Sequence, residues 1–231
     1  MSISELEALA CDHCGATIRA RVFTSVNAER HPHLRDEILA RRFHVFACPT
    51  CGQDTLVDGK VLYLDLGRRQ LLGVYPRDRM ADAATAAQEV FETWQESFVE
   101  GPPPTRPLAK RMLVRVCFGL EELREKLVID AAGLVDLYVE ALKAGLLAGD
   151  PRFAALQVTG LSLDAVTPEG ALRFIPLGLG RATDGKVPLI EIPEKAYAEM
   201  AGRRGELLAA KPCLASGPHV SVARLVLAAE G

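Results

Sequence analysis

Four of the six cysteines lie in two short pairs, Cys11-Asp-His-Cys14-Gly15 and Cys48-Pro-Thr-Cys51-Gly52. A gap of two residues lets both thiolates of one turn reach a single ion at about 2.3 Å. The glycine that follows each pair can take a positive φ, which turns backbone N–H groups towards the sulfurs. Pro49 presets the second turn. We therefore predict that Cys11, Cys14, Cys48 and Cys51 bind one metal ion.

Two such turns, called the knuckles below (residues 11–15 and 48–52), would form a closed tetrahedral site of four thiolates. Zinc and iron both fit that donor set. The predicted cofactor is one structural zinc ion, with a rubredoxin-like iron centre as the minor alternative. A closed site has no coordination position for water, so its binding free energy, on the order of 10 kcal/mol, would stabilise the fold. A thioredoxin-type redox pair is disfavoured because such a pair opens a helix, whereas a predicted strand follows Cys51.

Four histidines, His13, His31, His33 and His44, lie within or between the knuckles. Because four sulfurs already complete the coordination sphere, we predict that these side chains are on the surface or support the ligands. His44 is the best supporting candidate, since the predicted strand 43–47 runs directly into Cys48.

No residue set in the sequence predicts a catalytic site. Cys117 and Cys213 are isolated and are expected to be buried thiols. The segment Pro176-Leu-Gly-Leu-Gly-Arg181 lacks a phosphate-loop pattern and is interpreted as a turn. A charged run is expected to be a solvated helix face; it contains Glu121, Glu122, Arg124, Glu125 and Lys126.

The composition indicates an ordinary globular protein of 231 residues, 49% of them apolar and 25% charged. The net charge is −3, and residues 1–60 hold seven Lys/Arg against eight Asp/Glu, so nucleic acid is an unlikely partner. The start of the chain has no signal-like pattern, and four charged residues interrupt the apolar stretch 127–147. The cysteine pattern suits reduced thiols better than a disulfide framework. Together, these features predict a cytoplasmic protein without a membrane span.

Apolar periodicity predicts strands at 17–26, 43–47 and 71–75 and a helix at 32–40. Asp58-Gly59 predicts a hairpin between strands 55–57 and 61–66. A helix is expected at 79–99, with an apolar stripe that packs on the sheet or, alternatively, forms an exposed partner seam. The stripe consists of Met80, Ala84, Ala87, Phe91, Trp94 and Phe98.

The Pro-rich segment 101–107 is predicted to be a linker between residues 1–100 and 108–231. Beyond it we expect a strand at 111–118 and helices at 120–127 and 131–147, broken near 129–130. Strands are expected at 156–163, 171–175, 188–192 and 219–227, and a helix at 194–201. The predicted fold class is α+β: zinc-ribbon-like N-terminal knuckles on a small antiparallel sheet with packing helices, followed by a mixed α+β C-terminal part.

Over residues 9–145 the chain resembles the CpXC domain family, named for two Cys-Pro-X-Cys motifs. The resemblance is carried by the two knuckles, Asn27, Pro32-His-Leu-Arg-Asp-Glu-Ile-Leu, Leu62-Tyr-Leu-Asp, Arg115-Val-Cys-Phe, Glu122-Leu-Arg-Glu-Lys-Leu and Leu134-Val-Asp-Leu-Tyr-Val-Glu-Ala-Leu-Lys. The first knuckle departs from the pattern, with Asp12 where proline is expected. The resemblance implies a bacterial or archaeal protein whose zinc-binding region spans residues 1–100 and whose family-like part continues, helical, through 108–148. The family has no assigned activity, so it supplies no catalytic residues.

The predicted function is therefore a non-catalytic, zinc-stabilised binding or scaffold protein, with a protein partner or self-association. An enzyme or rubredoxin-like electron carrier is the alternative, with chemistry in the last third of the chain or at an iron-loaded site. A nucleic-acid-binding zinc ribbon comes third, because the local charge is unsuitable for phosphate contacts.

Overall fold

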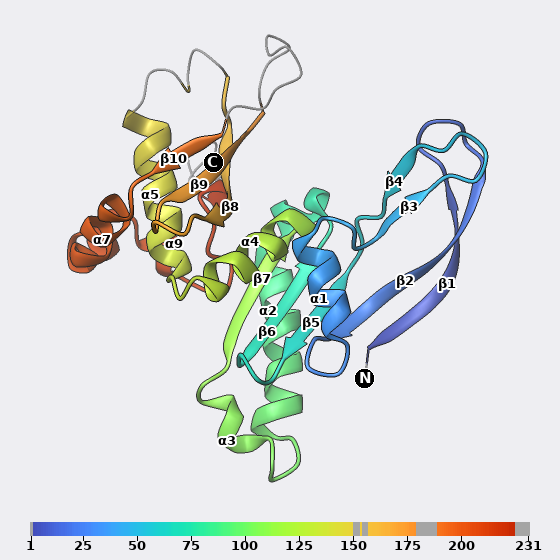
Figure 1. Ribbon diagram of the computed structural model, residues 1–231. Helices are drawn as coiled ribbons and strands as arrows, with labels where there is room; N and C mark the ends of the chain where they lie inside the picture. Colours follow the sequence, from blue (N-terminus) through green and yellow to red (C-terminus); the bar gives the residue numbers. More distant parts are fainter. Residues whose placement is uncertain (1, 150–152, 154–156, 179–188, 225–231) are drawn as a thin grey trace. The chain divides into compact units, whose positions relative to one another are not determined.

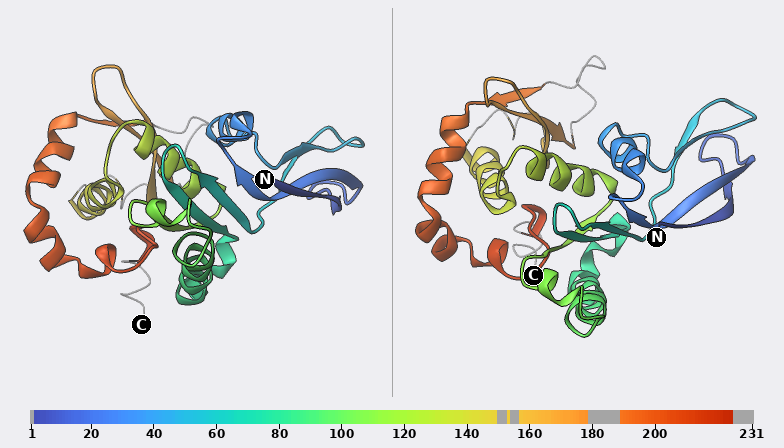
Figure 2. Two further views of the ribbon diagram at one scale, coloured as in Figure 1. Left: turned by 90° about the horizontal axis from the view of Figure 1, so that it is seen from below. Right: turned by 60° about the horizontal axis from the view of Figure 1, so that its bottom comes forward.

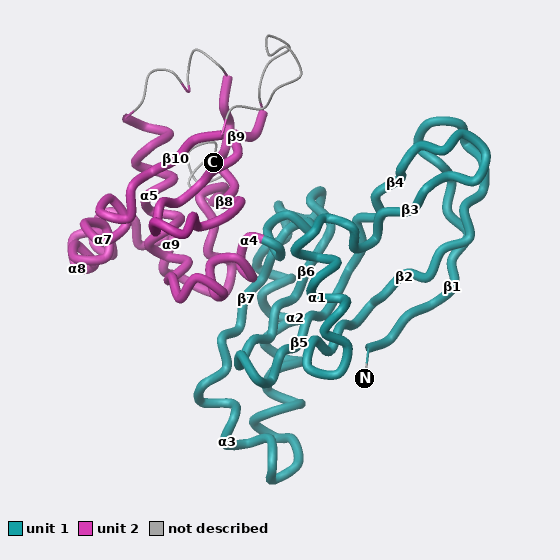
Figure 3. Tube along the Cα trace, in the orientation of Figure 1, with its two compact units in different colours: residues 1–124 teal, residues 125–231 magenta. Residues whose placement is uncertain are grey.

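The computed structural model describes residues 2–149, 153, 157–178 and 189–224. The protein is α+β and divides into two compact units, Met1–Arg124 and Glu125–Gly231 (Figure 3). Helix α4 (Leu120–Ala131) begins in the first unit and ends in the second. None of the helices in the described ranges is long and apolar enough to cross a membrane.

The first unit is built on a five-stranded mixed sheet of order β1-β2-β5-β6-β7. Its strands are β1 (Ile3–Ala10), β2 (Thr17–Asn27), β5 (Val61–Asp65), β6 (Gln70–Tyr75) and β7 (Leu113–Phe118). The pairs β1–β2 and β5–β6 are antiparallel, whereas β2–β5 and β6–β7 are parallel. All six residues of β6 are buried, as expected of an apolar strand that has a neighbour on each side in a sheet covered on both faces.

Two ribbons extend from this sheet and form what we call the arm, residues 3–24 and 43–57 (Figures 1 and 2). The first ribbon is β1 with most of β2, because in the described pairing only the end of β2, from Ser25 to Asn27, contacts β5. The second ribbon pairs β3 (Val45–Ala47) with β4 (Asp54–Leu56). The predicted hairpin at Asp58-Gly59 is therefore wrong: β4 pairs with β3 across the second knuckle, and the Asp58 carboxylate accepts a hydrogen bond from the Arg77 N–H.

Helices cover both faces of the sheet. Helix α1 (Pro32–Leu39) buries Leu34 and Ile38 on one face, and α2 (Ala83–Trp94) lies on the other (Figure 1). The single helix expected at 79–99 consists of three pieces, since a 3-10 turn, η1 (Arg77–Asp82), precedes α2 and a π-helical turn, η2 (Gln95–Val99), follows it.

The face of α2 that packs on the sheet coincides only partly with the expected apolar stripe. Ala86 and Val90, which are not in the stripe, are buried, whereas Phe91, which is in it, is 48% exposed. The reason lies in β6, where Gly73 has no side chain and Val90 packs directly over it; a Cβ at Gly73 would lie 2.1 Å from Val90 Cγ2. This contact sets the rotation of α2, and a periodic pattern alone cannot show it.

The chain after the Pro-rich segment returns to the same sheet. The short helix α3 (Arg106–Ala109) overlaps that segment, and β7 then pairs with β6. Residues 101–107 therefore lie inside the first unit, and the boundary between the units falls in α4. Helix α5 (Asp136–Gly149) begins after a break at residues 132–135, a few residues later than expected.

The second unit contains a three-stranded antiparallel sheet of order β10-β9-β8. Its elements are β8 (Gly160–Val166), β9 (Leu172–Leu177), β10 (Ile190–Ile192), α5, α7 (Glu194–Gly202), α8 (Arg204–Ala210) and α9 (Pro212–Ala215). Val139, Leu163 and Phe174 are fully buried in its core. Of the strand expected at 219–227, residues 219–224 form no strand and the rest lies outside the described residues. Residues 179–181 of the expected turn also lie outside them.

Candidate metal centre

The two knuckles have the same backbone geometry. In each, the glycine N–H donates to the carbonyl of the first cysteine at 2.9 Å, from Gly15 to Cys11 and from Gly52 to Cys48. Both glycines have a φ of 71°, in the left-handed region that glycine adopts without a side-chain clash. The predicted need for glycine after each pair is confirmed.

The turns bring the four sulfurs of Cys11, Cys14, Cys48 and Cys51 within 4.8 Å of one another. The Cys11 and Cys51 sulfurs are 3.7 Å apart, and those of Cys14 and Cys48 are 3.6 Å apart. Thiolates at about 2.3 Å from one ion would form a tetrahedron with edges of about 3.8 Å. Disulfide sulfurs would be only about 2 Å apart. The cluster thus has the dimensions of a site that can hold a metal ion.

Backbone N–H groups point at the first sulfur of each knuckle, from His13 to Cys11 and from Thr50 to Cys48, both at 3.4 Å. The His13 N–H is the main reason that the pKa of Cys11 is lowered to about 6. The Ala16 N–H lowers the pKa of Cys14, but the Cys51 thiol, burial and the remaining thiols outweigh it and raise this pKa to about 12. Crowding therefore opposes full ionisation of the four thiols, and a bound cation would remove that opposition.

The four sulfurs meet where the turns of the two ribbons of the arm face each other. Cys11 and Cys48 are buried beside Ile18 and Ala20, whereas Cys14 and Cys51 are exposed. This apolar cluster is small, and Leu6 in β1 is 68% exposed. With so little apolar surface buried, a bound ion would supply much of the connection between the ribbons.

A comparison with protein-family models matches residues 9–143 to the family described as CpXC protein. The chain belongs to the CpXC family. The resemblance seen in the sequence over residues 9–145 is thus confirmed. No match was found among curated proteins or among solved structures. In this CpXC protein the family match includes both knuckles, the sheet of the first unit apart from most of β1, and the first half of α5.

His44 does not support the cysteine ligands by any contact that the structure gives. It is buried, and its Nε2 accepts a hydrogen bond from the Phe23 N–H at 2.9 Å, which connects β2 to the start of β3. Its ring stacks on Phe43, with ring centroids 4.0 Å apart. Burial lowers the pKa of His44 to about 4, so the ring is neutral and can accept this hydrogen bond at neutral pH.

The remaining histidines near the knuckles do not join the sulfur cluster in the described part of the chain. His31 Nδ1 lies 2.9 Å from the Ser2 hydroxyl, and its ring contacts that of His33 edge-on at 5.9 Å. Cys117 is buried, as expected of an isolated thiol, whereas Cys213 is only partly buried.

The charged run in α4 differs most from the sequence prediction. Arg124, Glu125 and Lys126 are 8%, 4% and 4% exposed, so they are not part of a solvated face. The Arg124 Nε donates to the Leu39 carbonyl at the end of α1, within the first unit. Glu125 and Lys126 belong to a buried ionic network in the second unit.

This network contains three acids and two lysines, all at most 6% exposed: Glu125, Lys126, Asp136, Glu140 and Lys143. Lys143 Nζ lies 2.7 Å from Glu125 and 2.8 Å from Glu140. Lys126 Nζ lies 3.5 Å from both Asp136 and Glu140 and donates to the Val220 carbonyl at 2.5 Å. The spacing of residues 136, 140 and 143 on one face of α5 could have indicated such a network, but only burial distinguishes it from a solvated face.

Proposed function

We propose that this CpXC protein is a non-catalytic binding or scaffold protein of the reducing cytoplasm, in which a structural zinc ion holds the arm together. The observation that carries the proposal is the cluster of four sulfurs on two equivalent turns, at the spacing of a tetrahedral thiolate site. Four thiolates complete a tetrahedral sphere, so the ion would supply folding energy and organise the cysteines.

Zinc is preferred to iron because it is the usual ion of structural sites with four thiolates. The chain's own residues would then have separate parts in the site. Cys11, Cys14, Cys48 and Cys51 would be the ligands, and the N–H groups of His13 and Thr50 would stabilise negative charge on two of the sulfurs.

A partner-binding role is supported by the exposed surface of the arm. Ile3, Leu6 and Leu56 are 56%, 68% and 55% exposed, although each is a large apolar side chain. Side chains of this type on an extended ribbon can contact a protein partner or a second copy of the chain.

The metal proposal is tested by elemental analysis of reduced protein together with amide hydrogen exchange. We expect about one equivalent of zinc, and loss of the metal in Cys48→Ser with faster exchange throughout the arm while residues 125–224 keep their protection. Cys213→Ser is the matched control and is expected to keep both metal and protection. Less than about a tenth of an equivalent of any transition metal would overturn the proposal. A red protein with bound iron would favour the electron-carrier alternative.

The partner proposal needs its own experiment. Sedimentation of the zinc-loaded protein and a pull-down with it as bait should find self-association or a stable partner that the Cys48→Ser protein does not bind. Finding neither would contradict the scaffold role and leave the metal proposal intact.

A further inference from the structure

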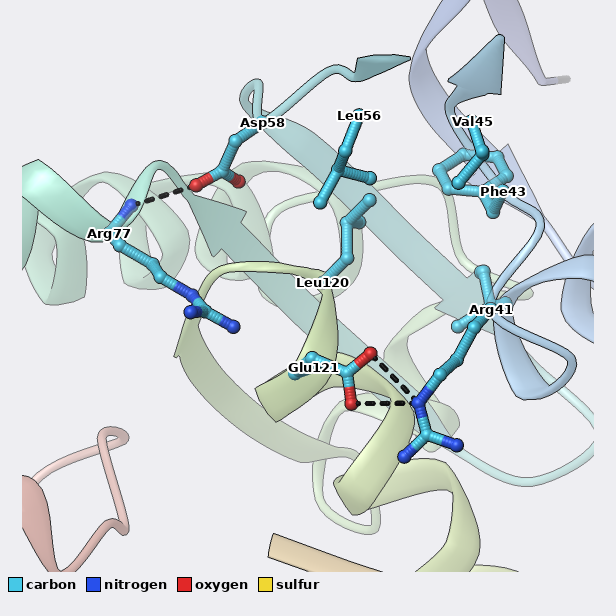
Figure 4. Close-up of a pocket in the computed structure, with 9 residues that line it drawn as sticks. Arg41, Phe43, Val45, Leu56, Asp58, Arg77, Leu120 and Glu121 are labelled. Carbon is cyan, nitrogen blue, oxygen red and sulfur yellow. Dashed lines mark hydrogen bonds and ion pairs between the residues drawn. The ribbon is translucent and has the colours of Figure 1, made fainter. Parts of the chain in front are cut away.

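The first unit contains a pocket of about 250 Å³ between the second ribbon of the arm and the start of α4 (Figure 4). Its apolar wall is formed by Ile38, Phe43, Val45, Leu56 and Leu120. Its volume lies just below the range of about 300–1,000 Å³ for drug-sized ligands. The space therefore suits a single branched aliphatic chain.

Two arginines and two acids border this apolar space. The Arg41 Nε lies 3.1 and 3.2 Å from the two carboxylate oxygens of Glu121, so these charges largely neutralise each other. Asp58 accepts the backbone N–H of Arg77 at 3.1 Å. Both contacts engage the acids and leave the Arg77 side chain as the cation available to a ligand.

The Arg77 guanidinium forms no ion pair or hydrogen bond with the described residues, and it extends along the pocket (Figure 4). Its side chain lies across Gly119, where a Cβ would be 2.6 Å from Arg77 Nε. Gly119 has a φ of 83° and directly precedes α4, whose positive dipole end favours an anion nearby. Because Gly119 has no side chain, the Arg77 side chain has room to lie there, which places its guanidinium beside the apolar cavity.

We propose that this pocket binds an aliphatic carboxylate, with the carboxylate on Arg77 and the aliphatic chain against Val45, Leu56 and Leu120. A guanidinium binds a carboxylate through two parallel N–H donors, and the apolar wall removes the hydrocarbon from water. A free branched-chain acid and the C-terminal residue of a polypeptide both present this chemistry. The proposal deepens the binding function proposed above and rests on it for the ligand's role.

The candidate metal centre is connected to this pocket through the second ribbon of the arm. Val45 and Leu56 lie on β3 and β4, the two strands that the second knuckle connects. If the ion holds the knuckle, its removal should loosen this wall and weaken ligand binding.

The test is a titration of the zinc-loaded full chain with 4-methylpentanoate, followed by NMR of the methyl groups. We expect saturable shifts at Ile38, Val45, Leu56 and Leu120. Arg77→Gln should weaken binding about tenfold or more, since it removes a charge-assisted contact from an exposed side chain. Arg42→Gln, at an exposed arginine outside the pocket, is the matched control and should bind like wild type.

Two peptides distinguish the sources of the carboxylate. If acetyl-Ala-Ala-Leu with a free carboxylate binds more tightly than 4-methylpentanoate, the ligand is a polypeptide C-terminus; if only the small acid binds, the ligand is a free acid. Equal binding of the peptide amide, or of leucinamide, would overturn the proposal, as would equal binding by Arg77→Gln.

Metal content measured on the same sample separates the two proposals. A zinc-loaded protein that shows no saturable shift refutes the pocket and leaves the metal centre standing. A metal-free protein that binds the acid through Arg77 refutes the metal centre and supports the pocket.

Discussion

Replacing Lys143 by methionine is expected to destabilise the second unit strongly. Lys143 is 2% exposed and contacts Glu125 and Glu140 at 2.7 and 2.8 Å. Burial opposes its charge, but these two carboxylates outweigh that effect and raise the pKa of Lys143. The lysine is therefore charged at neutral pH, and its loss leaves the three buried carboxylates of the network with one lysine, Lys126, which lies 3.5 Å from both Asp136 and Glu140.

Breaking a buried ion pair by removing one partner costs about 3–5 kcal/mol, because the other charge stays buried without compensation. With a urea m-value of about 2 kcal/mol/M, the unfolding midpoint would fall by roughly 2 M. Glu125→Gln in addition should restore part of this loss. The glutamine keeps an oxygen for the Leu163 N–H that now donates to Glu125, and it carries no charge. The double variant is thus expected to be more stable than the sum of the single changes predicts, by at least about 2 kcal/mol.

The assay is urea unfolding followed by circular dichroism, together with amide exchange of β8, which reports on the second unit directly. Amide exchange is needed because the fluorescence of Trp94, the only tryptophan, would report on the first unit. Lys195→Met is the matched control. Lys195 is a lysine of the same unit, 85% exposed, paired with Glu199 at 3.7 Å, and its loss should change stability by at most about 0.5 kcal/mol.

Two results would refute this account of the network. One is a Lys143→Met protein whose stability is within about 1 kcal/mol of wild type. The other is a double variant in which the effects of Lys143→Met and Glu125→Gln simply add, since groups that act as a pair must couple.

Two further predictions concern the first unit. The pKa of His44, lowered by burial to about 4, lies below the unfolded value of about 6.5, so the unfolded chain binds this proton more readily. The free energy of unfolding should therefore fall by up to about 3 kcal/mol as the pH drops from about 6.5 to 4. His44→Gln should remove this pH-dependent component when it is compared with wild type by urea unfolding at each pH. Parallel plots of stability against pH for the two proteins would contradict this prediction. Gly73→Ala should cost about 1–3 kcal/mol in thermal unfolding, because its Cβ would lie 2.1 Å from Val90 Cγ2. Gly145→Ala is the control, because Gly145 lies in the exposed part of α5 with nothing within 4 Å of an added Cβ, and it should be neutral or stabilising. If Gly73→Ala changes the stability no more than Gly145→Ala does, α2 can move aside.

The knuckles could be predicted from sequence because their geometry is local. Two residues between cysteines and a glycine after them determine where the sulfurs and N–H groups of one turn lie. That the two knuckles face each other could be predicted because four thiolates fit around one ion, and the positions of the four sulfurs agree with this arrangement. Strands such as β2 and β6 and the helix α1 were also recognisable, since their apolar periodicity reflects burial on a sheet or helix face.

Strand pairing could not be obtained in this way. The turn signal at Asp58-Gly59 is genuine local chemistry, but β4 pairs with β3 across the second knuckle, and β5 pairs with β2 and β6. Likewise, β1 carries no clear alternation, because most of its residues are exposed on the arm, and an apolar pattern could therefore not predict this strand.

Local sequence thus determined the cysteine turns that could hold a metal ion, most of the helices and the α+β class, because each depends on residues a few positions apart. Tertiary structure alone decided which charges are buried. Glu125 and Lys143 have the same chemistry as any surface pair in the sequence, and only the packing of α4 against α5 and β8 removes them from water. It also decided where Arg77 lies, since a glycine 42 positions further along the chain provides the space for its side chain.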